Sequence, residues 1–142
     1  MPVLVQSLSL LGAMQAATVA LMLWLGVRSD ASRAVRSLHL RASALAVEAM
    51  GYAALAFRDY LPHDMLLLGG NALNLLAQAM SVIALRMLLN VPLRWREAIV
   101  VGLGGWAGVA WFTVVEPDYQ SRVLWGSVAI ACYLMLNIDA LL

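Results

Sequence analysis

Residues 65–89 read MLLLGGNALNLLAQAMSVIALRMLL, an apolar run that carries one charged side chain, Arg86. A helix of this length rises about 37 Å, which is enough to cross a bilayer core about 30 Å thick. Four further apolar stretches fill most of the remaining chain, at 3–27, 38–57, 98–115 and 123–142. The sequence therefore predicts an all-α integral membrane protein, a bundle of about five transmembrane helices.

The composition agrees with this fold class. Hydrophobic residues make up 63% of the chain and charged residues 12%, whereas roughly 25% of the residues in an average soluble domain are charged. The five predicted spans leave no room for a second domain, so residues 1–142 are expected to form a single transmembrane domain. The sequence lacks the alternating apolar segments of about ten residues that a membrane β-barrel requires.

The arginines predict the orientation in the membrane, because alternate loops receive very different numbers of them. One side of the membrane receives Arg28, Arg33, Arg36, Arg41, Arg86, Arg94 and Arg96, and the other receives Arg58 and Arg122. The positive-inside rule makes the first side cytoplasmic, with the N-terminus outside and the C-terminus in the cytoplasm. The segment 28–41 is interpreted either as a short helix on the anionic cytoplasmic surface or as a basic loop.

Polar residues inside the predicted spans are the candidates for function. A carboxylate at Glu48, near the middle of the second span, costs several kcal/mol unless it is paired, hydrated or protonated, so it should face the bundle interior. Gln15 and Gln78 lie at nearly the same depth, and the three could form one hydrogen-bonded layer. Asn71, Asn74 and Gln78 follow helical spacing and share one face of the third span.

Two interpretations of these residues stay open. Glu48, Gln15, Gln78, Asn71 and Asn74 could form a proton-responsive or ligand-binding centre, because a desolvated carboxyl couples its charge to the helix arrangement. They could equally tie the helices together, at about 1 kcal/mol for each buried hydrogen bond. The fourth span carries Gly104 and Gly108, a pair that favours close helix contact, either within the bundle or between two copies of the chain.

The outer loops hold a second set of candidates. The outer-face candidates are Pro62, His63, Glu116, Pro117 and Arg122. His63 and the neighbouring acidic residues are typical of a solvated loop, and no metal site is predicted. Because a phosphate-binding glycine loop, a zinc-protease motif and a nucleophile elbow are missing from the sequence, no catalytic residue and no cofactor is assigned to this chain.

Several landmarks occur in an order that resembles a known family. They are WLGVR at 24–28, AFRDYLP at 56–62, LGGN at 68–71 and WFTVVEPD at 111–118, followed by Arg122. This order resembles the N-terminal membrane region of bacterial diguanylate cyclases, the GGDEF proteins. By position, the resemblance marks Pro62, Asn71, Glu116, Pro117 and Arg122 as structural or sensing residues near the outer face.

The resemblance implies a sensory input module in the bacterial inner membrane. Such a module controls a cytoplasmic output through its last helix, here cyclic di-GMP synthesis by a diguanylate cyclase domain beyond residue 142. The chain itself carries no cyclase signature. Because the last apolar stretch reaches Leu142 with no polar stop, the chain is expected to be a fragment of a longer one.

The expected partners are the lipid bilayer, a second copy of the chain and an unidentified small ligand. No nucleic-acid partner is predicted, because the arginines flank spans instead of lining a groove. Two alternative functions stay open. The chain could be a small proton-coupled transporter centred on Glu48, or a structural subunit of a membrane complex.

Overall fold

The structure is a computed structural model that describes residues 2–27, 32–57 and 63–142, with the side chains of residues 2–5 and 63 outside the description. The helices are α1 (Pro2–Gly26), α2 (Arg33–Ala56), α3 (His63–Leu89), α4 (Trp95–Ala110), the short π-helix η1 (Trp111–Val115) and α5 (Tyr119–Leu141). The described residues contain no strand, and the predicted all-helical class is confirmed.

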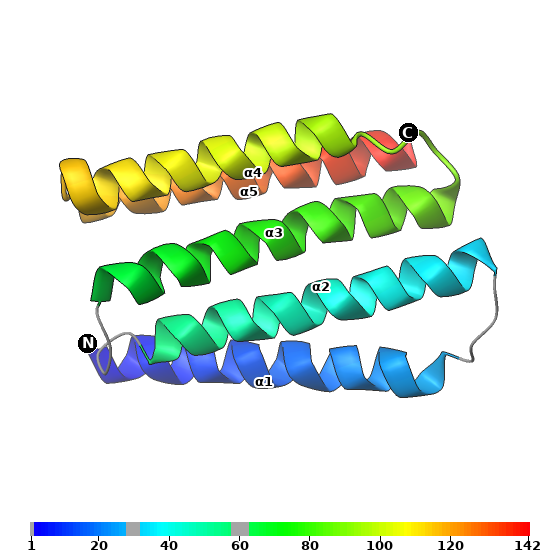
Figure 1. Cartoon of the computed structure of the whole chain (residues 1–142), viewed down its shortest axis with the longest axis horizontal. Helices are drawn as coiled ribbons and strands as arrows, with labels where there is room; N and C mark the ends of the chain where they lie inside the picture. Colours follow the sequence, from blue (N-terminus) through cyan, green and yellow to red (C-terminus); the bar gives the residue numbers. More distant parts are fainter. Residues whose placement is uncertain (1, 28–31, 58–62) are drawn as a thin grey trace.

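Consecutive long helices run antiparallel (Figure 1). Among the described helices, α1 makes close backbone contacts with α2 alone, α2 also packs on α3, and both α4 and α5 pack on α3 and on each other. The bundle is therefore a row of three helices, α1, α2 and α3, with α4 and α5 paired along the far side of α3. The chain begins at one end of the bundle and finishes at the other.

Four segments of the described chain are long and apolar enough to cross a membrane, namely Gln6–Gly26, Asp64–Leu89, Trp95–Val115 and Tyr119–Leu141. The protein is accordingly a multi-pass membrane protein. The helix α2 is less apolar, but its 24 residues span about 36 Å. Because α1 and α3 run in the same direction on either side of α2, the chain has to return across the bilayer along α2 (Figure 1).

The start of α2 differs from the prediction. The helix begins at Arg33, five residues before the predicted span, and Ser32 caps it by accepting a hydrogen bond from the backbone N–H of Val35 at 3.3 Å. One turn later the buried Ser37 hydroxyl donates to the carbonyl of Ala84 on α3 at 2.6 Å. Residues 33–41 are thus helical, as one of the two interpretations of this segment expected, but they form the first turns of α2 and not a short helix of their own. The interpretation as a loop was wrong for these residues. Residues 28–31 lie outside the described chain.

Small residues bring neighbouring helices together. A Cβ atom on Gly51 of α2 would lie 2.3 Å from Oδ1 of Asn74 and 3.0 Å from the carbonyl oxygen of Gly70, both on α3. A Cβ atom on Gly108 of α4 would lie 1.6 Å from Nε1 of Trp125 on α5. Gly108 therefore packs within the bundle, which was one of the two interpretations of the glycine-rich fourth span.

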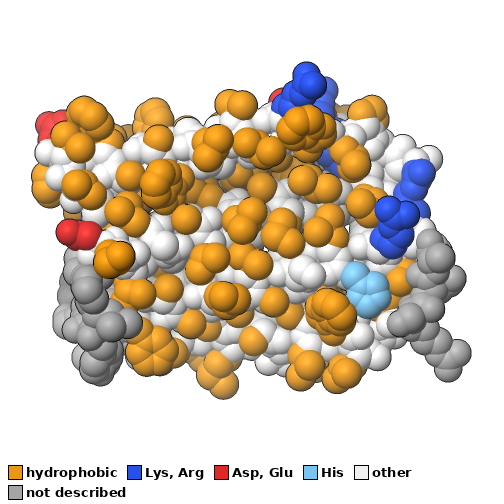
Figure 2. All heavy atoms as spheres, viewed as in Figure 1, with side chains coloured by type: hydrophobic (Ala, Val, Ile, Leu, Met, Phe, Trp, Pro, Cys, Tyr) orange, Lys and Arg blue, Asp and Glu red, His pale blue; other side chains and the backbone are white. Residues whose placement is uncertain are grey.

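The surface matches a membrane environment. Figure 2 shows hydrophobic side chains over almost the whole face that it presents, with arginines gathered at one end of the bundle. At that end α3 finishes with Asn90 in the left-handed conformation (φ 60°). The N–H of Val91 donates to the carbonyl of Arg86 at 3.1 Å, and the N–H of Asn90 donates to that of Met87 at 3.4 Å. This cap satisfies two of the last carbonyls of the helix.

Candidate functional site

A cavity of about 170 Å³ with both polar and apolar lining residues lies inside the bundle, bounded by α2, α3, α4 and α5. It is lined by Glu48, Tyr52, Asn71, Asn74, Leu75, Gln78, Val109, Gly126 and Ile130. The structure therefore brings the predicted candidates Glu48, Asn71, Asn74 and Gln78 to one cavity. The two asparagines and Gln78 share a face of α3 as their spacing predicted, and this face is directed toward α2 and α5.

Asn74 has an unsatisfied polar atom. Its Oδ1 is buried and has no hydrogen-bond partner among the described residues, although a buried amide oxygen without a partner is costly. Asn71, by contrast, donates from Nδ2 to the carbonyl of Leu67 in its own helix at 2.7 Å. The cavity wall thus offers an acceptor at Asn74 that a water molecule or a ligand could satisfy.

Glu48 is half-buried and lines two cavities, one on each side of α2. The second cavity, of about 310 Å³, lies between α1 and α2, and Gln15 and Arg41 are among its lining residues. The described residues provide no hydrogen bond or ion pair to the Glu48 carboxyl. A carboxyl group in this setting can accept hydrogen bonds from a donor that enters either cavity.

The expected single layer of Gln15, Glu48 and Gln78 does not form in the structure. Gln15 is exposed and lines only the cavity between α1 and α2, while Gln78 lines the cavity on the other side of Glu48. The physical reason is the helix order, because α1 contacts α2 alone. Similar depth in the membrane therefore did not bring Gln15 and Gln78 together.

A third cavity, of about 410 Å³, shares Gln78 with the cavity around Glu48, and its lining residues Ser37 and Leu88 lie near the arginine-rich end of α2 and α3. Nη1 of Arg41 on α2 donates to the hydroxyl of Ser81 on α3, and Ser81 donates in turn to the carbonyl of Ala77 at 2.7 Å. Oδ1 of Asn137 on α5 is buried and has no partner among the described residues. None of these residues was among the predicted site candidates, although a polar Asn137 in an otherwise apolar helix was an available signal.

The outer-face candidates differ in where the structure places them. Pro62 lies outside the described residues, as does the side chain of His63, the first residue of α3. Glu116 and Pro117 are exposed. The guanidinium carbon of Arg122 lies 5.4 Å from the centre of the Tyr119 ring, a cation–π contact within α5. Among the described residues, no group of three His, Cys, Asp or Glu side chains could hold a metal ion.

Asp118 caps α5 beside these candidates. Its carboxylate accepts hydrogen bonds from the hydroxyl of Ser121 and from the backbone N–H groups of Gln120 at 3.1 Å and Ser121 at 3.2 Å. These bonds, the one from the Ser121 hydroxyl first, lower the pKa of Asp118 below its ordinary value of 3.8. Asp118 thus has a structural role that the sequence analysis did not assign.

Arg86 is the most buried arginine among the described residues, with 2% of its surface exposed. Its guanidinium donates to the carbonyls of Pro92 and Leu136, each at 3.0 Å, and pairs with Asp139 of α5. Nη1 of Arg94 lies 3.4 Å from the same Asp139 carboxylate. Arg86 was interpreted only as an orientation signal, yet its hydrogen bonds and ion pair connect α3 with α5 and with the loop before α4.

Comparison with known proteins gives no relative from which a role could be transferred. No family model matches the chain, and no curated protein and no solved structure is similar enough to count as a match. The resemblance to the membrane regions of diguanylate cyclases therefore rests only on the four landmarks at 24–28, 56–62, 68–71 and 111–118, with Arg122.

Proposed function

We propose that the protein is a membrane-embedded sensory or regulatory module and that the cavity around Glu48 is its input site. The observation that carries this proposal is the placement of a carboxyl group without a counter-ion among the described residues in a cavity bounded by four helices. We expect the charge of a carboxylate in such a place to be compensated by a ligand or by a proton. Either event changes the forces between the helices, which is what an input site requires.

The last helix provides the route to an output. Gly126 and Ile130 of α5 line the cavity, and α5 continues from there to Leu141 at the arginine-rich end. If the positive-inside rule holds, this end faces the cytoplasm of a bacterium whose inner membrane holds the protein. The proposed output is a cytoplasmic signalling activity, and the resemblance to GGDEF proteins favours cyclic di-GMP synthesis by a cyclase domain that follows α5.

The proposed module acts as a homodimer in the bilayer. The exposed apolar side chains of α1, among them Leu11, Met14 and Leu21, support this proposal, because α1 packs on α2 alone within the described chain. We expect the mass of the nanodisc-embedded protein, with lipid counted separately, to equal two chains. A mass of one chain would contradict the dimer.

The input role is tested by distances between helices. Spin labels placed on α1 and α5 of a Cys132→Ala background should give a distance distribution that shifts as the pH is changed. In Glu48→Gln the shift should be lost. Glu97→Gln is the matched control, because Glu97 is an exposed carboxyl outside the cavity, and it should keep the shift. A shift that survives in Glu48→Gln would refute the proposed input site.

A second candidate function is a small proton-coupled transporter. It is favoured by the fact that Glu48 lines a cavity on each side of α2, since a transporter exposes its ionisable residue along a substrate path. A pH gradient across proteoliposomes separates the two functions. Dissipation of the gradient that depends on Glu48 would favour the transporter, whereas helix movement without proton flux would favour the sensor.

A further inference from the structure

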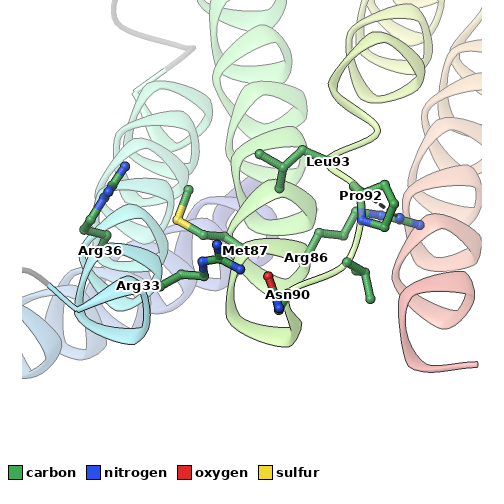
Figure 3. A pocket seen from close by; sticks show the side chains of 8 residues that line it. Arg33, Arg36, Arg86, Met87, Asn90, Pro92 and Leu93 are labelled. Atoms are coloured by element: carbon green, nitrogen blue, oxygen red, sulfur yellow. Dashed lines mark hydrogen bonds between the residues drawn. The ribbon is translucent and has the colours of Figure 1, made fainter.

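A separate cavity of about 520 Å³ opens at the arginine-rich end of the bundle. It is lined by Arg33, Arg36, Arg86, Met87, Asn90, Val91, Pro92 and Leu93. These residues come from the start of α2, the end of α3 and the loop that follows α3 (Figure 3). Neither the Glu48 site nor the proposed signalling function uses this cavity.

The charge of the cavity is positive, because its lining contains three arginines and no acidic residue. Arg86 is held in place by the carbonyls of Pro92 and Leu136 and by Asp139, which lies on α5 and does not line the cavity. Its buried Nε has no hydrogen-bond partner among the described residues. Arg86 thus places a positive charge at a fixed position in the cavity lining.

Arg33 and Arg36 supply uncompensated charge. They lie one turn apart on α2, are exposed, and make no hydrogen bond or ion pair with any described residue. Figure 3 shows the Arg33 guanidinium reaching from α2 toward Met87 and Asn90 at the end of α3. The cavity therefore combines the Arg33 guanidinium with the side-chain amide of Asn90. Arg36 lines the same cavity, but in Figure 3 its guanidinium points away from these two groups, so it has to turn toward them to share a ligand.

This set of groups suits a phosphate. Guanidinium groups bind phosphate oxygens through paired N–H donors, and Arg33 is also the first residue of α2, where the helix dipole favours an anion. The lining residues Met87, Val91 and Leu93 add apolar surface next to these donors. Basic pockets between transmembrane helices at a membrane surface bind lipid headgroups in this way.

We propose that this cavity binds a phosphate group, with an anionic phospholipid as the source that the apolar lining favours over a soluble phosphate compound. The arginines hold the phosphate, and the apolar lining residues contact the glycerol end of the lipid. A bound lipid then bridges α2 and α3 at the end of the bundle where α5 ends.

Native mass spectrometry of the full chain provides the test. The chain is released from nanodiscs that contain phosphatidylglycerol and phosphatidylcholine, and the retained lipids are counted. The wild type should retain phosphatidylglycerol in preference to phosphatidylcholine. The double variant Arg33→Gln/Arg36→Gln should bind phosphatidylglycerol about 25-fold more weakly, given about fivefold for each arginine.

The matched control is Arg96→Gln/Arg122→Gln, which removes the same charge outside the cavity and should weaken binding less than about threefold. The proposal would be overturned if both double variants weakened binding equally. It would also be overturned if the wild type neither preferred phosphatidylglycerol nor bound inorganic phosphate. Inorganic phosphate that displaces phosphatidylglycerol from the wild type would assign the site to soluble phosphates, and failure to displace it would assign the site to lipid. If the glutamine double variant does not fold, Arg33→Lys/Arg36→Lys replaces it; this variant keeps the charge but should lose part of the preference for phosphatidylglycerol. The comparison of the two lipids on the wild type needs no variant.

Discussion

Arg86 of α3 and Asp139 of α5 form an ion pair in which the arginine side chain is 3% exposed and the aspartate side chain 45% exposed. The pair lies at the arginine-rich end, where Arg86 also donates to the carbonyl of Leu136 on α5. Because the carboxylate keeps access to solvent and to Arg94, the two partners are not equivalent. Loss of the carboxylate leaves a buried cation, whereas loss of the arginine leaves a half-exposed anion with another partner.

This asymmetry gives the first prediction. Asp139→Ala should lower the free energy of unfolding by about 2 kcal/mol, less than the 3–5 kcal/mol typical of a fully buried pair, because Arg86 keeps its two carbonyl acceptors. The measurement is unfolding in mixed micelles by titration with dodecyl sulfate. Glu116→Ala, an exposed carboxyl near the start of α5, should change stability by less than about 0.5 kcal/mol. Equal effects of the two substitutions would contradict the role given to Asp139.

The close approach of α2 and α3 gives the second prediction. In Gly51→Ala the new Cβ would lie 2.3 Å from Oδ1 of Asn74 and 3.0 Å from the Gly70 carbonyl. Either the helices separate or Asn74 moves, and we expect a loss of about 1–3 kcal/mol in the free energy of unfolding. The Glu48 cavity should change as well, because Asn74 lines it.

Gly69→Ala is the control for this substitution. A Cβ at Gly69 meets no atom within 4 Å, and alanine is favoured over glycine inside a helix by about 0.5–1 kcal/mol. Gly69→Ala should therefore be neutral or stabilising in the same titration. A loss of stability equal to that of Gly51→Ala would show that the α2–α3 contact is looser than described.

The third prediction concerns the pH dependence of stability near Asp118. The hydrogen bonds from Ser121 and Gln120 lower the folded-state pKa of Asp118 below 3.8. Their contribution to stability is therefore complete at a pH above the ordinary pKa of an aspartate, and it is lost as the pH falls through the folded-state pKa. Asp118→Asn should keep the cap, since asparagine caps helices about as well as aspartate, but it should lose this pH-dependent component.

The measurement is the midpoint of thermal unfolding in detergent between pH 6 and pH 2 for the wild type and Asp118→Asn. The advantage of the wild type should shrink as the pH falls. The control variant is Asp64→Asn, because Asp64 is a carboxyl in the first turn of another helix, α3. A constant difference between wild type and Asp118→Asn across the whole range would contradict the capping role.

Much of the fold could be predicted from the sequence, because hydrophobicity is a local property of the chain. The run at 65–89 became α3 with its end unchanged at Leu89. The spacing of Asn71, Asn74 and Gln78 correctly placed all three on one face, since helical periodicity is also local. The start of α2 was placed too late because the charges of Arg33 and Arg36 put them outside the apolar span. That they continue the same helix depends on the Ser32 cap and on contacts with α3.

The candidate site could be predicted only in part, because it depends on which helices are neighbours. Depth in the membrane suggested a layer of Gln15 and Gln78 with Glu48, but α2 separates the two glutamines. The role of Arg86 was missed for the same reason. Its partner Asp139 is 53 residues away in the chain, and nothing in the sequence pairs α3 with α5.

The central claim is that the Glu48 carboxyl responds to its surroundings inside the bundle. Infrared difference spectroscopy of the nanodisc-embedded protein between high and low pH tests this claim directly, because a protonated carboxyl has its own C=O stretching band. We expect a band that changes with pH in the wild type and in Glu97→Gln and that is missing in Glu48→Gln. Identical difference spectra for Glu48→Gln and the wild type would contradict the account.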